Sequence, residues 1–277
     1  MISSKLREYS YTKVCEVMMK EYPVIDKDQS ILQAIREMDK YGIDRIVVVE
    51  NGEPIGIMTK KDVVNKLLVE RTRRSSAARM HVSSFMSSPI IKINEGENIV
   101  EAARKMVEKD ISSLLVVDSE GNPKGLVTKW GLVSIYRFVD DMHVRDALEP
   151  VIYTPRFGDR VIHLRALMLE KKFFFAPVVD LNGRVAGVVS IDEIADAIIT
   201  FYEFVPEKFR RRKRRELYVE EIMRRPPLTV KLDDTLSQVS HELLRSRSRG
   251  AVVVDEEEKI LGVVTIDGLT KTLSIVE

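Results

Sequence analysis

The chain has 277 residues, of which 44% are hydrophobic and 31% charged, and its formal net charge is +1. This balance is typical of a globular protein with a buried core, and it excludes an intrinsically disordered chain and an integral membrane protein. A net charge so close to zero also excludes a chain-wide attraction to nucleic acid or to membranes.

Cysteine and histidine usage predicts neither a disulfide nor a metal site. Cys15 is the only cysteine, and the four histidines do not stand at metal-ligand spacings. Residues 1–19 lack the apolar core of a signal peptide, and no segment reaches the roughly 18 apolar residues needed to cross a bilayer. We therefore expect a cytoplasmic protein without a metal.

The first 70 residues contain a succession of elements that later recurs. A short extended piece with a proline lies at 22–25, and Ile31, Ile35 and Met38 then recur at helical spacing. The β-branched run at 45–50 predicts a buried strand, which a tight turn connects to a partner strand at 54–59. A second helix is predicted over 60–70.

The same succession returns three times along the chain. A phrase of one glycine, two apolar residues and a hydroxyl begins at Gly56, Gly125, Gly187 and Gly262. An upstream mark, a valine followed four residues later by methionine or leucine, moves in step at positions 14, 82, 144 and 219. Because two independent marks keep the same spacing, we predict four duplicated units, called repeats 1 to 4, at 9–70, 78–139, 140–203 and 215–277.

Each repeat is too small to close a hydrophobic core alone, so the repeats are expected to pack in pairs. The predicted fold class is α/β (α+β), with four units that each hold a small, mainly three-stranded sheet and two helices. The strand, the hairpin and the recurring glycine phrase resemble CBS domains, four of which would form two Bateman modules arranged as a disc. In architecture the chain is similar to the γ subunit of AMP-activated protein kinase and to archaeal tandem CBS proteins.

The resemblance implies a regulatory protein without catalysis or a cofactor. It implies that AMP, ADP, ATP or a related adenosyl compound binds in clefts between paired units. It further implies energy sensing that a protein partner reads, while a second copy of the chain is left open as a partner. No membrane partner is expected, and a nucleic-acid partner is disfavoured.

The four hydroxyls of the phrase each stand where a strand ends and a helix begins. They are Thr59, Thr128, Ser190 and Thr265. Serine and threonine are preferred helix caps, and the acids Asp62 and Glu193, three residues after their hydroxyls, also fit a capping box. A ligand role is the alternative, since a helix start attracts phosphate and a carboxylate can accept hydrogen bonds from a ribose diol.

By resemblance, the aspartate of the phrase contacts the ribose. Only Asp62 matches it in type and position, while Glu193 has one more methylene and Gly131 and Gly268 have no carboxylate. The sites of repeats 2 and 4 are therefore expected to bind differently or to stand empty.

Basic residues just before the buried strands are candidates for contact with nucleotide phosphates, because a guanidinium can bind two oxygens at once. Arg45 is the candidate in repeat 1, and Arg247 and Arg249 are the candidates in repeat 4. By resemblance alone, Ile43 and Asp44 supply backbone contacts to the base. For each of these cations, a solvated surface charge is the alternative.

Two other functions stay open. A protein-interaction scaffold would keep the four repeats without a ligand, as the missing aspartates suggest. A nucleic-acid-binding regulator would use the basic run 208–215, although that run also fits a solvated connector between repeats. No pattern assembles a nucleophile, a base and an oxyanion site, so no enzymatic activity is predicted.

Overall fold

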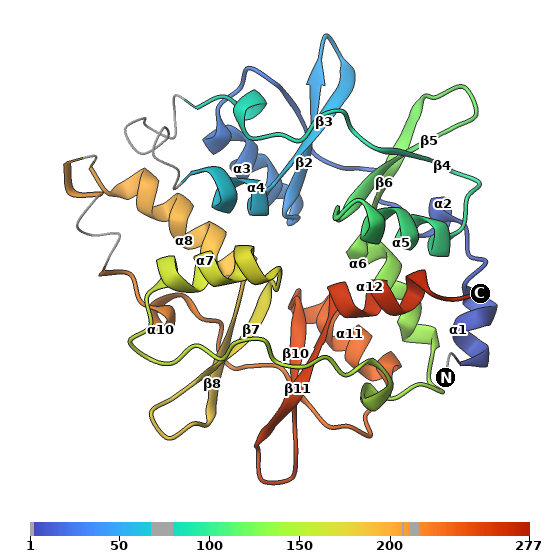
Figure 1. Cartoon of the computed structure of the whole chain (residues 1–277). Coiled ribbons are helices and arrows are strands. Elements are labelled where there is room, and N and C mark those ends of the chain that lie inside the picture. Colours follow the sequence, from blue (N-terminus) through green and yellow to red (C-terminus); the bar gives the residue numbers. More distant parts are fainter. Residues whose placement is uncertain (1–2, 68–79, 207, 211–215) are drawn as a thin grey trace. The chain divides into compact units, whose positions relative to one another are not determined.

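The computed structural model describes residues 3–67, 80–206, 208–210 and 216–277 (Figure 1). The chain divides into two compact units. Unit 1 consists of Met1–Glu21, Ile91–Val151 and Pro227–Glu277, and unit 2 consists of Tyr22–Ile90 and Ile152–Pro226. The chain therefore passes from one unit to the other four times.

Unit 2 holds the sheets of repeats 1 and 3. Repeat 1 comprises β1 (Val24–Asp26), α3 (Ile31–Tyr41), β2 (Arg45–Glu50), β3 (Glu53–Thr59) and α4 (Lys60–Lys66). Repeat 3 comprises α7 (Val161–Lys171), β7 (Phe175–Val179), β8 (Val185–Ser190) and α8 (Ile191–Phe204). Two short helical turns from the first parts of repeats 2 and 4 complete the unit, η2 (Val82–Ser84) and α10 (Val219–Ile222).

Unit 1 holds the sheets of repeats 2 and 4. Repeat 2 comprises β4 (Lys92–Asn94), α5 (Ile99–Glu108), β5 (Ser113–Val117), β6 (Pro123–Thr128), α6 (Lys129–Val133) and η3 (Ser134–Phe138). Repeat 4 comprises β9 (Thr229–Val230), α11 (Leu236–Ser246), β10 (Gly250–Val254), β11 (Ile260–Thr265) and α12 (Ile266–Ser274). The unit also contains α1 (Ser4–Tyr9), α2 (Val14–Val17) and η4 (Val144–Ala147).

The sheets repeat one topology, which confirms the predicted mixed fold class. In repeats 1, 2 and 4 a short first strand runs parallel to the middle strand, and the middle strand forms an antiparallel hairpin with the last. The sheet of repeat 3 has two strands, β7 and β8, and a single parallel bridge from Arg156 to Val179 stands where the first strand lies in the others.

Helix α3 shows how the sequence specifies these elements locally. The Ser30 side chain caps its start by accepting a hydrogen bond from the Gln33 amide, and Gly42 ends it in the left-handed conformation with φ 64°. Ile31, Ile35 and Met38 are buried as their spacing predicts, because side chains three or four residues apart share one face of a helix.

The first part of each repeat, which runs on from the valine of the upstream mark and is called here its opening segment, pairs with the last strand of a neighbouring repeat. Single antiparallel bridges join Met19 to Leu126, Ser87 to Ile57, Glu149 to Val263 and Arg224 to Val188. The opening segment of repeat 1 thus pairs with the sheet of repeat 2, and that of repeat 2 pairs with the sheet of repeat 1. Repeats 3 and 4 exchange their opening segments in the same way.

This exchange explains the glycine of the recurring phrase. A Cβ atom added to Gly125 would lie 2.5 Å from Met18 Sδ and 2.7 Å from the Met19 carbonyl oxygen. The corresponding glycines in the other repeats, Gly56, Gly187 and Gly262, meet Met86, Met223 and Leu148 in the same way. The upstream methionine or leucine and the glycine therefore recur together because they contact one another across two repeats.

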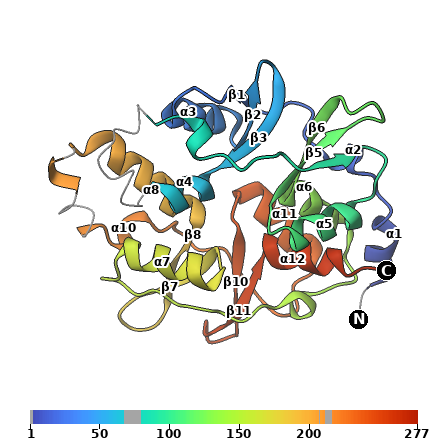
Figure 2. The ribbon, with the colours of Figure 1, turned by 45° about the horizontal axis from the view of Figure 1, so that its top comes forward.

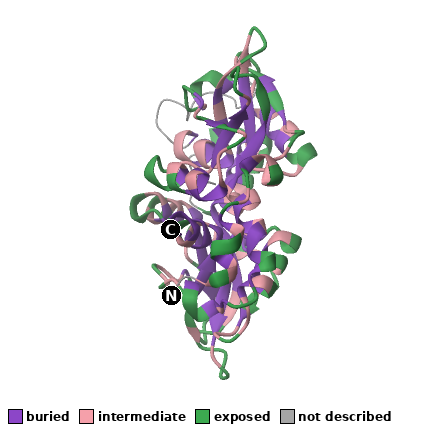
Figure 3. Cartoon of the chain, turned by 90° about the vertical axis from the view of Figure 1, so that its right-hand side faces the viewer, coloured by how far each residue is buried: buried purple, intermediate pink, exposed green. Residues whose placement is uncertain are grey.

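Each unit has one hydrophobic core, which two non-consecutive repeats share. The core of unit 2 joins side chains of repeats 1 and 3, and the core of unit 1 joins those of repeats 2 and 4. Helix α4 packs on α8 in one unit, and α12 packs on α5 and α6 in the other, as Figure 2 shows. Most strand residues are buried (Figure 3), because helices and opening segments cover them.

Equivalent ion pairs also join the repeats within each unit. Lys60 Nζ lies 2.6 Å from Asp196 Oδ1 in unit 2, and Lys129 Nζ lies 2.6 Å from Asp267 Oδ1 in unit 1. Burial alone would lower the pKa of Lys60, but its hydrogen bond to Asp196 and the charges of Asp196 and Asp39 raise it above its ordinary value. The lysine is therefore charged where it joins α4 to α8.

Two buried tyrosines form hydrogen bonds between helices of paired repeats. Tyr202 donates its hydroxyl to the Leu67 carbonyl oxygen at 2.8 Å, and Tyr136 donates to that of Leu269, also at 2.8 Å. Burial raises the pKa of the Tyr136 hydroxyl far above its ordinary range, so it stays a donor.

Replacing either tyrosine with phenylalanine should lower the free energy of unfolding by about 1–2 kcal/mol, because a buried carbonyl loses its partner. Chemical denaturation of Tyr136→Phe and Tyr202→Phe measures the loss. Tyr11→Phe is the matched control, since Tyr11 is 74% exposed. An equal effect in all three variants would contradict the assigned bonds.

Candidate functional site

The site predicted in repeat 1 is built at the junction of β3 and α4. Thr59 is the last residue of β3 and caps α4, and its hydroxyl accepts a hydrogen bond from the Asp62 amide at 3.2 Å. In return Asp62 Oδ2 accepts hydrogen bonds from the Thr59 amide at 2.8 Å and from the Thr59 hydroxyl at 2.7 Å. The capping box expected from the sequence is therefore present.

The second carboxylate oxygen of Asp62 distinguishes this site. Within the described part of the chain, Asp62 Oδ1 accepts no hydrogen bond, since both bonds to Asp62 end on Oδ2. Burial raises the pKa of Asp62 above its ordinary value, although the bonds from Thr59 and the nearby lysines Lys61 and Lys66 oppose that shift. The capping box thus fixes one oxygen and leaves the other as an acceptor.

The strand before this junction brings Arg45 opposite Thr59 in the β2–β3 register. The Arg45 side chain is 1% exposed, and its guanidinium donates to both carboxylate oxygens of Asp44 at 2.9 and 3.0 Å. The Asp44 carbonyl accepts from the Lys60 amide at 2.8 Å, and the Ile43 amide donates to Met38. The structure thus brings all five predicted residues of repeat 1 into unit 2, with Arg45 already paired.

Repeat 3 has the same arrangement with a glutamate. Glu193 Oε2 accepts from the Ser190 amide at 2.8 Å and from the Ser190 hydroxyl at 2.5 Å. Its other oxygen, Oε1, lies 3.2 Å from an Arg224 guanidinium nitrogen of the exchanged opening segment. The predicted residues Ser190 and Glu193 lie together, but here an arginine takes the second oxygen.

Repeats 2 and 4 have glycines, Gly131 and Gly268, at the helix position where repeat 1 has Asp62. Thr128 caps α6 by accepting from the Gly131 amide at 3.2 Å, and a Cβ atom at Gly131 would lie 2.6 Å from the Val17 carbonyl oxygen. Backbone of the opening segment therefore occupies the space of a side chain at position 131. No carboxylate replaces the missing acid among the described neighbours of Thr128.

In repeat 4 a distant part of the chain provides a carboxylate to the helix start. Thr265 caps α12, and its amide and hydroxyl donate to Glu149 Oε1 at 3.1 and 2.6 Å. A Cβ atom at Gly268 would overlap the Glu149 carboxylate. Glu149 thus stands where Asp62 stands in repeat 1, although it precedes Thr265 by 116 residues.

The arginines predicted for repeat 4 do not match Arg45 in register. Gly250, not an arginine, stands opposite Thr265 as Arg45 stands opposite Thr59. Arg249 is buried, and its carbonyl accepts from the Ile266 amide at 2.9 Å, which is the role of Asp44 in repeat 1. Arg247 ends α11 in the left-handed conformation with φ 50°, which is the role of Gly42.

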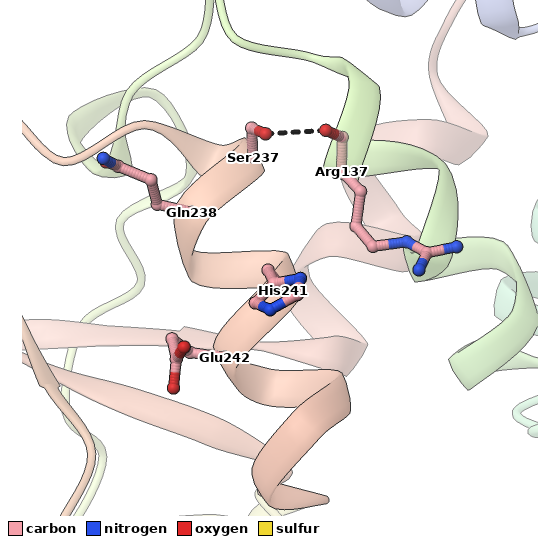
Figure 4. Close-up of a pocket in the computed structure, with 5 residues that line it drawn as sticks. All are labelled: Arg137, Ser237, Gln238, His241 and Glu242. Atoms are coloured by element: carbon pink, nitrogen blue, oxygen red, sulfur yellow. Dashed lines mark hydrogen bonds between the residues drawn. The ribbon is translucent and has the colours of Figure 1, made fainter.

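Other features of the described residues offer no competing centre. A surface pocket in unit 1 is lined by Arg137, Ser237, Gln238, His241 and Glu242, where Ser237 donates to the Arg137 carbonyl at 2.6 Å (Figure 4). The described residues contain no group of three potential metal ligands. None of their helices is both long and apolar enough to cross a membrane.

The sequence profile of the CBS domain matches residues 14–69, 82–137, 141–200 and 219–275. The chain belongs to the CBS domain family. It carries four CBS domains, which correspond to repeats 1 to 4.

Two archaeal proteins resemble this four-domain chain along its length. Protein MJ1225 of Methanocaldococcus jannaschii is 25% identical over 257 residues, which are 85% of this chain and 89% of that protein. Its solved structure matches with a TM-score of 0.80 at 21% identity, over 94% of this chain and 99% of that one. A protein from Pyrococcus horikoshii matches with a TM-score of 0.63 at 18% identity, over 95% and 100%.

A third relative shares only part of its length. A homoserine O-acetyltransferase of Methanohalobium evestigatum is 35% identical over 122 residues, which are 44% of this chain and 24% of that enzyme. The shared part is about a quarter of the enzyme, so its name does not describe this chain.

Two site residues, Glu149 and Arg224, are absent from the residues predicted from the sequence. Both stand five positions after the valine of the upstream mark, where the other CBS domains have Met19 and Ser87. This position always bridges the last strand of the exchanged domain. Aligning it across the four domains would have drawn attention to its varied charge, but the exchange itself has no local signal.

Proposed function

We propose that the chain is a non-catalytic regulatory protein that binds an adenine nucleotide or a related adenosyl compound at CBS domain 1. CBS domains are regulatory modules with adenosyl ligands, which supports this class of function. The relative MJ1225 is described as a candidate archaeal homolog of g-AMPK, which agrees with it. In this proposal the bound nucleotide changes how a protein partner recognises the chain.

The free oxygen of Asp62 is the observation that carries the proposal. A carboxylate held by its own cap and open at the other oxygen can accept hydrogen bonds from both hydroxyls of a ribose, and such charge-assisted bonds are the stronger kind. Asp62 is partly buried and its pKa is raised, and carboxylates with raised pKa values cluster at functional sites. In the proposal Arg45 contributes to phosphate binding if the nucleotide competes with Asp44 for its guanidinium.

Replacing Asp62 with asparagine should weaken AMP binding by about 1.5–3 kcal/mol, which is roughly tenfold or more. Asparagine keeps an oxygen for the Thr59 amide but loses the charge that strengthens bonds to the ribose. Isothermal titration calorimetry with AMP measures the change, and Asp28→Asn, an exposed aspartate of the same CBS domain, is the control. Equal affinities in all three proteins would refute the role of Asp62.

The effect of Asp62 on the free energy of unfolding distinguishes ligand binding from a purely capping role. Because burial raises the pKa of Asp62 in the folded state, its favourable contribution is present below the unfolded pKa and is lost as the pH rises through the folded pKa. At neutral pH the ionised carboxylate therefore opposes folding. We expect Asp62→Asn to unfold no more easily than the original protein at pH 7 while it binds AMP more weakly.

The two alternative functions make different demands. A ligand-free scaffold would show no thermal shift with any adenine compound. A nucleic-acid regulator would use the basic run 208–215, of which residues 211–215 lie outside the described residues. In the described part, Arg210 donates to the carbonyls of Val205 and Tyr202 at 2.9 Å and lies over the Tyr202 ring, so it caps the end of α8. This engagement favours the connector over the nucleic-acid role.

A further inference from the structure

The carboxylate at the start of α12 comes from outside CBS domain 4. Glu149 belongs to the opening segment of domain 3, whose backbone bridges Val263 through two hydrogen bonds of 2.8 and 2.9 Å. This bridge holds Glu149 two residues after the Val144–Ala147 turn and beside the last strand of domain 4. The position of its carboxylate is therefore fixed by backbone pairing as well as by its side chain.

The hydrogen bonds of Glu149 reproduce those of Asp62. In domain 1 the Thr59 amide and hydroxyl donate to one oxygen of Asp62 at 2.8 and 2.7 Å. In domain 4 the Thr265 amide and hydroxyl donate to one oxygen of Glu149 at 3.1 and 2.6 Å. Within the described residues, the second oxygen of each of these two carboxylates accepts no hydrogen bond.

Gly268 shows that the replacement is specific to this place. It occupies the helix position of Asp62, and all three atoms nearest to its added Cβ belong to the Glu149 carboxylate. Any side chain at 268 would displace that carboxylate. The helix has thus lost an acid at the position where another segment provides one.

The other two CBS domains show that this is not a general feature. Beside domain 2, Met19 takes the position that Glu149 has beside domain 4, and it has no carboxylate. Beside domain 3, that position is Arg224, whose guanidinium contacts the second oxygen of Glu193. Among the described residues, only domains 1 and 4 therefore present such a carboxylate with an open oxygen at the start of the helix that follows their last strand.

We infer that Glu149 is the ligand-contact carboxylate of CBS domain 4, in place of an aspartate at the position of Gly268, and that this domain takes a second molecule with a ribose diol. The inference rests on the proposed function of domain 1 and extends it to two ligands per chain. Burial raises the pKa of Glu149, as it does for Asp62, with Asp267 adding to the shift and Lys271 opposing it. Burial is thus the largest cause of the raised pKa at both carboxylates, although the neighbouring charges differ.

AMP titration of the full chain by calorimetry tests the inference through its stoichiometry. The original protein should bind two AMP molecules, Glu149→Gln should weaken one site about tenfold or more, and Asp62→Asn should weaken the other. Two unaltered sites in Glu149→Gln, or a single site that only Asp62→Asn removes, would overturn the inference and leave the proposed function standing. No AMP binding by the original protein would overturn the proposed function itself.

A second test moves the carboxylate from position 149 to position 268. Glu149→Ala should lose the domain 4 site, and adding Gly268→Asp to that variant should restore it, because the removal of Glu149 vacates the space that a side chain at 268 needs. Gly268→Asp alone should destabilise the protein by displacing Glu149. Thermal unfolding of each variant identifies misfolded proteins, and a folded double variant that still lacks the site would contradict the inference.

Discussion

Gly125→Ala should lower the free energy of unfolding by about 2–3 kcal/mol, near the upper end of the usual range for overpacking a filled site. The added Cβ would lie 2.5 Å from Met18 Sδ and 2.7 Å from the Met19 carbonyl oxygen. The methionine side chain can rotate away, but the carbonyl is held by the backbone bridge between Met19 and Leu126. The opening segment must therefore move off β6.

Urea denaturation followed by circular dichroism measures this loss. Gly96→Ala is the control in the same CBS domain, because its added Cβ approaches nothing closer than Asn94 Oδ1 at 3.3 Å. Adding Met18→Ala to Gly125→Ala should recover little, since the carbonyl contact remains. Full recovery would show that only the sulfur contact matters and that the backbone bridge is looser than described.

Asp44→Ala should be comparably damaging, with an expected loss of about 3 kcal/mol in the free energy of unfolding. The Arg45 side chain is 1% exposed, so removal of the Asp44 carboxylate leaves a buried positive charge without its close counter-ion. We expect the lower end of the range for broken buried pairs because Arg45 also has other polar contacts. Chemical denaturation at neutral pH gives the measurement.

The double variant Asp44→Ala with Arg45→Met distinguishes this explanation from a loss of packing. Replacing both members of a buried ion pair with apolar or small side chains is often nearly neutral, so the double variant should recover most of the stability. A double variant as unstable as Asp44→Ala would show that the charge is not the cause. The same cycle, repeated with AMP present, reports whether the nucleotide competes for Arg45.

The repeat pattern was predictable because its determinants are local. The periodicity of Ile31, Ile35 and Met38 and the hydroxyl caps at Thr59 and Thr265 act within a few residues, so they are readable from one stretch of sequence. The capping role of Asp62 followed from the same local spacing. Its proposed contact with a ligand remains a prediction.

The remaining features depend on segments far apart in the chain. The shared cores of domains 1 and 3 and of domains 2 and 4 follow from packing between helices that no local pattern relates. The missing acid at Gly268 suggested a site that binds differently or stands empty, because the sequence does not show that Glu149 reaches the same helix start. Likewise the strand alone could not reveal that Arg45 is buried against Asp44.

The exchanged opening segments and shared cores bear on how such a chain can be shortened. A fragment cut after residue 139 would hold one complete exchange between domains 1 and 2, yet it would carry only half of each hydrophobic core. The exposed faces of α4 and α5 would then be free to associate with those of another such fragment. Such a two-domain fragment is therefore expected to self-associate through these faces.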